Sequence, residues 1–368
     1  MSRTSSPNTL RALTALVVLV GVTLLALLAE GSIRMLQWMR HGTASTVESL
    51  YTVDPALNLR IPTPGASTQT IHINSMGFRG PEIEQEKPAG RIRIAFLGAS
   101  TTFCAEASSN AAVWPHLVTL GLQQRYPERS FDYVNAGVPG YTLRSMLANL
   151  RLRVEPLRPD VIVIYEATND LSAEMRELAR GQALYARARV ENPSALARHS
   201  VLWSLVEKNW QIRRSQAEAR AGQGRLGFDP LQIGGAFRRD LLELVGEAKR
   251  IAPTVAVATF TYQPRPDQPP ERQLDAAASA LYYMPFMTPE GLIRGYERYN
   301  EIIRDVARET GVLLIAGELA IPGDPVHFTD SVHFTDAGSR AMAERVLRAL
   351  AAGDPGLDRL GLPVRTGR

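Results

Sequence analysis

Three side chains in this sequence could together carry out nucleophilic chemistry. Ser100 lies in a run of small residues, GASTT at 98–102, and Asp330 and His333 stand three residues apart near the end of the chain. An acid and an imidazole at that spacing can face the same way, so Asp330 can hold the Nδ1–H of His333 while Nε2 takes the serine proton. The residue types indicate a serine nucleophile, a histidine base and a carboxylate partner.

Two further motifs could stabilise an oxyanion. Gly137 ends the run NAG at 135–137, where the missing side chain lets a backbone N–H approach a ligand, and Asn169 lies in the run ATND at 167–170. Taken alone, each motif has an ordinary structural explanation, because Gly and Asn-Asp are common in turns and Ser and Thr often cap helices. Their places after successive apolar runs favour the functional interpretation.

A tandem repeat complicates the choice of histidine. The sequence VHFTD occurs twice, at 326–330 and 332–336, so Asp324 and His327 form a second D-x-x-H pair. A metal site is an alternative reading of the carboxylates and imidazoles that recur at every third position: Asp324, His327, Asp330, His333 and Asp336. We favour the serine chemistry and expect no metal, because no H-E-x-x-H or similar spacing occurs and no thiolate is available.

The other reactive side chains are given ordinary roles. Cys104 is the only cysteine, so no intrachain disulfide and no thiolate metal site can form. It follows Ser100 by four residues, but its small apolar body is more typical of a packed helix contact than of a nucleophile. The remaining histidines are interpreted as surface or core residues: His41, His72, His116 and His199.

The candidate residues follow short apolar runs that are typical of β-strands. Strands are expected at 91–97, 131–134, 160–165, 254–260 and 312–316, and helices at 110–126, 141–155, 237–251, 296–310 and 337–351. The run DVIVIY at 160–165 suits a strand that is buried on both faces. The alternation predicts an α/β architecture with a central, mainly parallel five-stranded sheet between helices, whose site lies beyond the carboxyl ends of the strands.

Several segments interrupt this alternation. Residues 41–90 are rich in Ser, Thr, Pro and Gly and are expected to form a stalk or apron that contacts the main domain at 91–352. Within that domain, 171–235 and 262–291 are expected to be insertions or lids over the strand ends, although their aromatic side chains could equally cover core. The tail at 353–368 is expected to fray.

Residues 1–40 are expected to form an N-terminal membrane anchor. The stretch 12–29 carries no charge and is long enough to cross a bilayer. A cleavable signal peptide is the alternative, because Arg3 and Arg11 form a basic leader. We favour a retained anchor, since the stretch is longer than a usual signal core. Two arginines precede the stretch and two follow it, so the slight cytoplasmic bias comes from the charge of the amino terminus. This bias favours a periplasmic or extracytoplasmic catalytic domain, and an inward orientation stays open.

In their order, these motifs resemble those of the SGNH or GDSL-type hydrolase family, over roughly residues 91–350. The resemblance implies a three-layer α/β/α, flavodoxin-like fold and a serine esterase whose catalytic triad is Ser100, His333 and Asp330. It implies an oxyanion hole built from the backbone N–H groups of Ser100 and Gly137 and from the side chain of Asn169.

The resemblance also bears on the tandem repeat. Gly338 and a helix-like stretch follow His333 at the spacing that the family shows, which favours His333 over His327. Two positions depart from the family pattern. Ala99 replaces the Asp of G-D-S, and Ala167 replaces the Gly of G-x-N-D, where the extra methyl could tilt Asn169.

The sequence therefore predicts a membrane-anchored serine esterase that hydrolyses O-acyl esters of a lipid or cell-envelope glycan without a cofactor. Two alternatives are an O-acyltransferase that uses the same triad on an envelope polysaccharide, and a non-catalytic, glycan-binding envelope protein. The complete set of motif residues argues against the last. A nucleic acid partner is not expected, because 41 Lys and Arg are nearly balanced by 37 Asp and Glu and no run of five like charges occurs.

Overall fold

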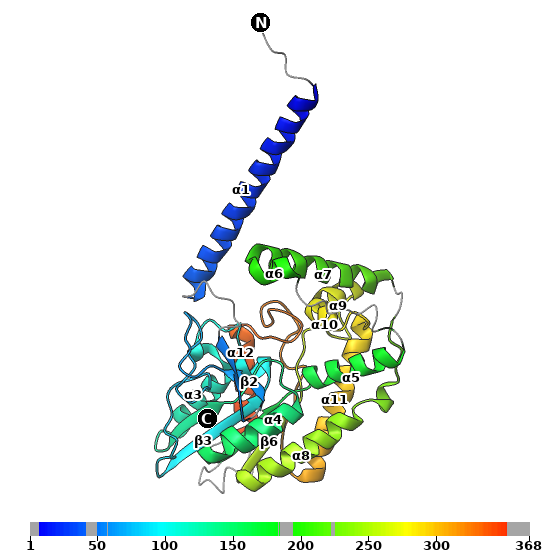
Figure 1. The fold of residues 1–368 in the computed structure, drawn as a ribbon. Helices are drawn as coiled ribbons and strands as arrows, with labels where there is room; N and C mark the ends of the chain where they lie inside the picture. Colours follow the sequence, from blue (N-terminus) through cyan, green and yellow to red (C-terminus); the bar gives the residue numbers. More distant parts are fainter. Residues whose placement is uncertain are drawn as a thin grey trace.

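A five-stranded parallel sheet forms the centre of the protein, as the computed structural model in Figure 1 shows. The structure describes residues 7–41, 50–56, 58–182, 184, 194–221 and 225–351. The expected tail at 353–368 lies outside these residues, as do parts of the segments 1–40, 41–90 and 171–235.

The sheet has the order β4-β3-β5-β6-β7, and every neighbouring pair is parallel. The strands are β3 (Arg91–Gly98), β4 (Ser130–Asn135), β5 (Val161–Tyr165), β6 (Thr254–Ala258) and β7 (Leu313–Ile315). Numbered along the chain within the sheet, this order is 2-1-3-4-5, which is the flavodoxin-like order. The predicted fold class is confirmed.

Helices cover both faces of the sheet (Figure 1). On one face α3 (Trp114–Arg125) packs against α12 (Asp336–Ala351). On the other face α8 (Gly235–Ile251) packs between α4 (Leu143–Asn149) and α11 (Pro289–Thr310). This division follows from right-handed crossovers, because the chain moves in one direction from β3 to β4 and in the other from β4 to β7.

Eight further helical segments belong to the described part of the domain. They are α2 (Ser100–Phe103), η2 (Asn110–Ala112), η3 (Leu150–Val154), η4 (Glu155–Leu157), α5 (Thr168–Gly181), η5 (Pro230–Gln232), α9 (Pro270–Ala276) and α10 (Ala278–Tyr283). The helix expected at 141–155 becomes π-helical after Asn149. The helix expected at 296–310 begins earlier, at Pro289, where the Thr288 side chain accepts the Gly291 N–H at 2.9 Å.

The described part of 50–90 packs onto the domain. It contains a two-stranded antiparallel sheet of β1 (Tyr51–Asp54) and β2 (Leu59–Pro62). Ile71 and Ile73 are buried against Phe103, and the Arg79 guanidinium donates to the Phe103 carbonyl at 3.0 Å. The segment is thereby attached to the helix that begins with Ser100.

The N-terminal helix α1 (Pro7–His41) stands away from the sheet (Figure 1). Its segment Leu13–Leu36 is long and apolar enough to cross a membrane, and none of its most apolar window is buried in the protein. A signal sequence near an N-terminus has the same properties. Near the charged end of this segment α1 contacts α7 (Val201–Ala221), which follows α6 (Ala195–His199).

Candidate active site

Ser100 lies directly after the carboxyl end of β3, where the chain makes a tight turn into α2. Gly98 is required there, because an added Cβ would lie 2.7 Å from the Tyr165 carbonyl oxygen on the neighbouring strand. The Thr102 and Phe103 N–H groups donate back to the Ala99 carbonyl at 3.1 and 2.9 Å. As the first residue of the helix, Ser100 leaves its own N–H without an intrahelical acceptor. The turn holds the serine at the rim of the sheet.

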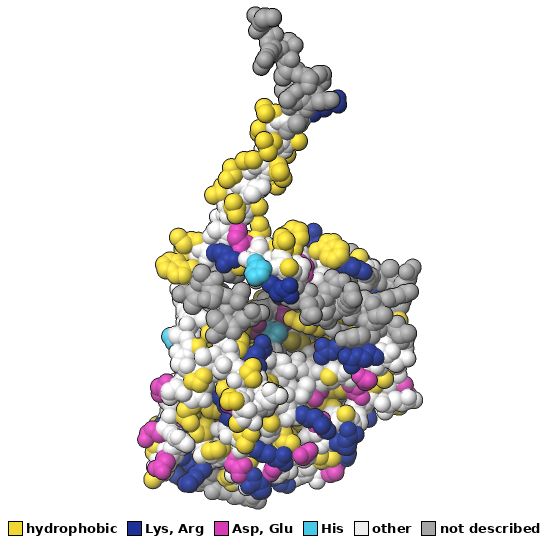
Figure 2. Space-filling view, in the orientation of Figure 1, with side chains coloured by type: hydrophobic (Ala, Val, Ile, Leu, Met, Phe, Trp, Pro, Cys, Tyr) yellow, Lys and Arg dark blue, Asp and Glu magenta, His cyan; other side chains and the backbone are white. Residues whose placement is uncertain are grey.

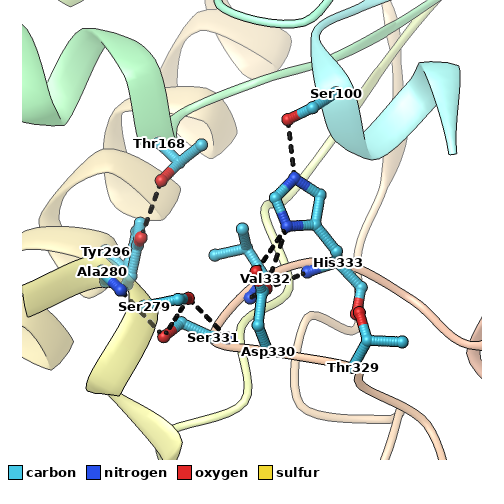
Figure 3. A network of polar contacts seen from close by, with 10 residues as sticks. All are labelled: Ser100, Thr168, Ser279, Ala280, Tyr296, Thr329, Asp330, Ser331, Val332 and His333. Carbon is cyan, nitrogen blue, oxygen red and sulfur yellow. Dashed lines mark hydrogen bonds and ion pairs between the residues drawn. The ribbon is translucent and has the colours of Figure 1, made fainter. Parts of the chain in front are cut away.

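The structure brings Ser100, His333 and Asp330 into one hydrogen-bonded line (Figure 3). His333 Nε2 lies 2.8 Å from Ser100 Oγ, and its Nδ1 lies 2.9 and 2.8 Å from the two carboxylate oxygens of Asp330. The contact between His333 and Ser100 joins residues 233 positions apart in the chain. The imidazole can therefore take a proton from the serine on one side while the carboxylate holds its tautomer on the other.

The loop that carries Asp330 is fixed by its neighbour Ser331. The buried Ser331 hydroxyl lies 2.9 Å from Ser279 Oγ and accepts the Ala280 N–H at 3.1 Å, both on α10 (Figure 3). The Gln263 N–H donates to the Ser331 carbonyl at 2.8 Å. A segment expected to be an insertion thus supports the loop that holds the acid.

Hydrogen bonds and charge favour the ionised forms of both partners. Burial opposes charge on His333, but the hydrogen bond to Asp330 and the negative charges of Glu106 and Asp330 outweigh it and raise its pKa to about 9. Burial likewise opposes charge on Asp330, but His333 and two backbone N–H groups hold the pKa of this carboxyl below its usual range. Asp330 therefore stays a carboxylate, and His333 is a strengthened base.

The first copy of the repeat does not reach the serine. Asp324 Oδ1 lies 2.8 Å from His327 Nδ1 and accepts the His327 backbone N–H at 3.0 Å, as Asp330 does for His333. The two copies pair antiparallel through a bridge between Phe328 and Phe334. Because of this pairing, the two histidines lie at different positions in the loop. Of the two, His333 contacts Ser100.

The loop after β4 packs closely on the serine turn. A Cβ on Gly137 would lie 2.5 Å from the Phe103 nitrogen and 2.9 Å from the Ala99 oxygen, so only glycine fits. The Gly137 N–H donates to the Asn135 Oδ1 at 3.1 Å, and the Asn135 Nδ2 donates to the Thr102 carbonyl at 3.0 Å. Asn135 thereby fastens the loop to the turn, and the N–H of Gly137 is engaged within the protein.

Asn169 lies in the first turn of α5, beside the same loop. Its Nδ2 donates to the Tyr141 carbonyl at 2.9 Å, which uses one of the two amide hydrogens. Its backbone N–H donates to Glu166 Oε1 at 2.7 Å. The methyl of Ala167 is fully buried and does not break this arrangement. Asn169 keeps one amide hydrogen for a further acceptor.

Two residues at this site escaped the sequence analysis. Glu166 is 2% exposed, and burial together with the charge of Asp170 raises its pKa well above the usual range. The signal in the sequence for Glu166 was its position, because it is a charged residue directly after the apolar run of β5. Gly140 is exposed in a Pro-Gly turn with φ of 87°, next to the Tyr141 carbonyl that Asn169 contacts. The dipeptide Pro139-Gly140 was the signal for that turn.

The metal alternative finds no geometric support among the described residues. No group of three or more His, Cys, Asp or Glu side chains there is arranged to hold an ion. Asp336 instead accepts the N–H and hydroxyl of Ser108, at 2.9 and 2.5 Å. Cys104 is buried next to the serine helix, and burial raises the pKa of its thiol to about 12.

Comparison with protein families identifies the relatives of this chain. The profile of the GDSL-like Lipase/Acylhydrolase family matches residues 96–341, more than half of the chain. The chain belongs to this family. It is accordingly an ester-hydrolysing serine hydrolase with the α/β fold described above. No curated protein matches the chain at the significance required.

Solved structures with low sequence identity also resemble it. The acetylxylan esterase Axe2 from Geobacillus stearothermophilus is 18% identical, covers 77% of this chain and 100% of its own, and gives a TM-score of 0.43. LAE5, an alpha/beta hydrolase enzyme from the metagenome of Lake Arreo, Spain, is 17% identical, covers 72% and 96%, and gives a TM-score of 0.42. At these values the likeness says nothing about the chemistry of this site.

Proposed function

We propose that the protein is a membrane-anchored serine esterase that hydrolyses O-acyl esters through Ser100, His333 and Asp330. The single observation that carries the proposal is the continuous line from the Ser100 hydroxyl through both nitrogens of His333 to the Asp330 carboxylate. A serine hydroxyl is a weak nucleophile unless a base takes its proton, and this line supplies the base. Membership of an acylhydrolase family supports the ester as the bond attacked.

In the proposed reaction, Ser100 Oγ attacks the ester carbonyl while His333 Nε2 takes the hydroxyl proton. The carbon–oxygen bond to the alcohol then breaks, and His333 returns the proton to the leaving oxygen. Water repeats the sequence on the acyl-enzyme and releases the acid. Asp330 holds the imidazole in the required tautomer and stabilises the imidazolium that forms in each step.

The oxyanion would accept hydrogen bonds from the Ser100 N–H and from the free amide hydrogen of Asn169. Gly137 was the expected third donor. Because its N–H is engaged by Asn135, we propose that Gly137 acts by allowing close packing, and that the N–H of the exposed Gly140 is the third donor. Gly140 directly precedes Tyr141, whose carbonyl orients the Asn169 amide.

We further propose that α1 is retained as a single membrane span and that the catalytic domain lies on the periplasmic or extracytoplasmic side. The uncharged stretch 12–29 and the exposure of Leu13–Leu36 support the span. The amino terminus adds a positive charge to the two arginines before the span, against two arginines after it, which supports a cytoplasmic amino terminus. The substrate would then be an acyl ester of a lipid or cell-envelope glycan close to the membrane.

Hydrolysis of a short-chain aryl ester by the full-length protein in detergent tests the catalytic part. Wild type is expected to release the phenol continuously, and Ser100→Ala, with its fold unchanged by circular dichroism, is expected to release none above background. Ser108→Ala is the matched control, since this exposed serine contacts Asp336 rather than the triad. Equal rates for wild type and Ser100→Ala would contradict the proposal.

A further inference from the structure

The helix α7 has two faces with different surroundings. Val201 is buried, and Ile212 lines a cleft of about 350 Å³ that also borders Asp330 and Ser331. On the outward face, Trp203, Val206 and Trp210 recur at helical spacing, and they are 43%, 48% and 56% exposed. The inward face therefore covers the loop of the catalytic acid, while large apolar side chains face away from the protein.

Basic side chains accompany this outward apolar face. Arg213 and Arg214 are exposed, and the Arg214 guanidinium lies 5.5 Å from the centre of the Trp210 ring. Arg198 is exposed on the neighbouring helix α6, whereas the Glu207 carboxylate of α7 accepts the Ser194 hydroxyl at 2.5 Å. Figure 2 shows hydrophobic and basic side chains together over α6 and α7, around the foot of α1.

A charged pair at the end of the apolar span fixes α7 to α1. Glu30 is the first charged residue after the stretch 12–29, and its carboxylate accepts the N–H groups of Val201 and Leu202 at 3.0 and 2.8 Å. It also accepts the Ser200 hydroxyl at 2.8 Å. Arg34 pairs with Glu30 at 2.7 Å and donates to the His199 carbonyl at 3.1 Å. The start of α7 is thereby held at the level where the uncharged stretch 12–29 ends.

The direction of the two helices follows from Figure 1. α6 and α7 lie across the side of the domain from which α1 projects, and α7 runs across the direction of α1 rather than along it. A bilayer crossed by the apolar part of α1 would therefore begin close to the plane of α7. Tryptophan and arginine side chains are favoured at that depth, where the rings meet the acyl boundary and the guanidinium groups meet lipid phosphates.

We propose that the outward face of α7, formed by Trp203, Val206, Trp210, Arg213 and Arg214, docks on the surface of the same bilayer that α1 crosses, with anionic lipid headgroups as its partner. This inference rests on the proposed membrane anchor. It gives the catalytic domain a fixed orientation, because one face of α7 lies on the membrane while the other lies over the loop of Asp330. The active site would thus open next to the lipid surface, where membrane-bound acyl esters are concentrated.

Site-directed fluorescence in the full-length protein can test the docking. Cys104 is buried with a raised thiol pKa, so a cysteine introduced at an exposed site is the one that a polarity-sensitive maleimide dye labels. Val206→Cys places the dye between the two tryptophans without removing either. Leu25→Cys reports on the span itself, and Leu152→Cys is the matched control. Leu152 is 56% exposed on η3, which leads in the chain toward the amino end of β5, whereas the active site follows the carboxyl ends of the strands.

Each labelled protein is reconstituted in vesicles of phosphatidylcholine and phosphatidylglycerol with and without doxyl-labelled lipid. We expect doxyl lipid to quench the dyes at residues 25 and 206, and the dye at 206 to emit at shorter wavelength than the dye at 152, which stays unquenched. Adding Trp203→Gln and Trp210→Gln should reduce the quenching at 206. Removing phosphatidylglycerol should reduce it as well.

The possible failures are distinguishable. If the dye at 25 is quenched while the dye at 206 behaves like the dye at 152, the anchor stands and the docking of α7 is refuted. If the dye at 25 is not quenched either, the proposed membrane anchor fails and the docking fails with it. Loss of ester hydrolysis is not a readout here, so neither outcome depends on the catalytic proposal.

Discussion

The two copies of the VHFTD repeat have the same local structure but different surroundings. In each, an aspartate three residues before the histidine lies 2.8 Å from its Nδ1 and accepts its backbone N–H. In the second copy, Nε2 also lies against a serine hydroxyl, at 2.8 Å. A short sequence is thus enough to pair an acid with an imidazole, whereas tertiary structure decides which pair can do chemistry.

The largest expected effect is the difference in kcat between variants of the two histidines. His333→Ala should lower kcat for aryl ester hydrolysis by about 10⁴- to 10⁶-fold, because the base for Ser100 is lost. His327→Ala should leave it within about twofold, since residues away from the reacting atoms have small effects. Steady-state kinetics on both variants checks this. Equal losses would break the comparison and reopen the metal interpretation of the repeat.

The aspartates that precede the two histidines should differ in the same direction. Asp330→Asn keeps the side-chain shape but favours the wrong imidazole tautomer, and we expect a loss in kcat of roughly 10⁴-fold. Asp324→Asn makes the equivalent change beside His327 and should change kcat little. The ratio of the two rates, measured at one pH with folding checked by circular dichroism, is the readout. A ratio near one would show that neither carboxylate orients the base.

A variant of Asn169 tests whether this side chain is an oxyanion donor at the site formed by Ser100 and His333. Asn169→Ala removes the free amide hydrogen and should cost about 2.7 to 4 kcal/mol of transition-state stabilisation, or 10²- to 10³-fold in kcat, with little change in KM. Thr168→Ala is a matched control, because its hydroxyl faces Tyr296 at 2.8 Å rather than the serine (Figure 3). A normal kcat for Asn169→Ala would remove this side chain from the mechanism.

The pH dependence of kcat/KM tests the effect of nearby negative charges on the pKa of His333. His333 accepts a proton only when neutral, so kcat/KM should rise with pH through its raised pKa, near 9, rather than near the ordinary value of about 6.5. Because the negative charge of Glu106 contributes to this rise, Glu106→Gln should move the acid limb to lower pH. The shift should be under about one unit, since Glu106 is exposed and screened by solvent. A limb that does not move would exclude this contribution.

Part of the fold could be predicted from the sequence, because it depends on local patterns of apolar and polar residues. The fully apolar run of β5 and the alternation of strands with amphipathic helices predicted the parallel sheet, and the order of the strands bears this out. The end of α4, where the helix becomes π-helical after Asn149, was not predicted. The Asn149 Nδ2 donates to the Ala136 carbonyl at 3.1 Å, and no local pattern reports that contact.

At the candidate site, the types of the proposed catalytic residues could be selected from the sequence, but the hydrogen-bond partners of the supporting residues could not. Ser100, Asp330 and His333 could be selected because few residue types do this chemistry. The engagement of the Gly137 N–H depends on how the Asn135 side chain folds back, and the contact of Glu166 with Asn169 depends on burial at the end of β5. Both are properties of packed loops, which spacing in the sequence does not encode.

Covalent labelling of Ser100 by a fluorophosphonate tests the central claim most directly, because the probe reacts only with a serine whose proton a base removes. We predict rapid labelling of wild type and of His327→Ala, with the adduct on Ser100 by peptide mass spectrometry, and no labelling of His333→Ala. Equal labelling of His333→Ala and wild type, or an adduct on another serine, would contradict the assignment of this triad.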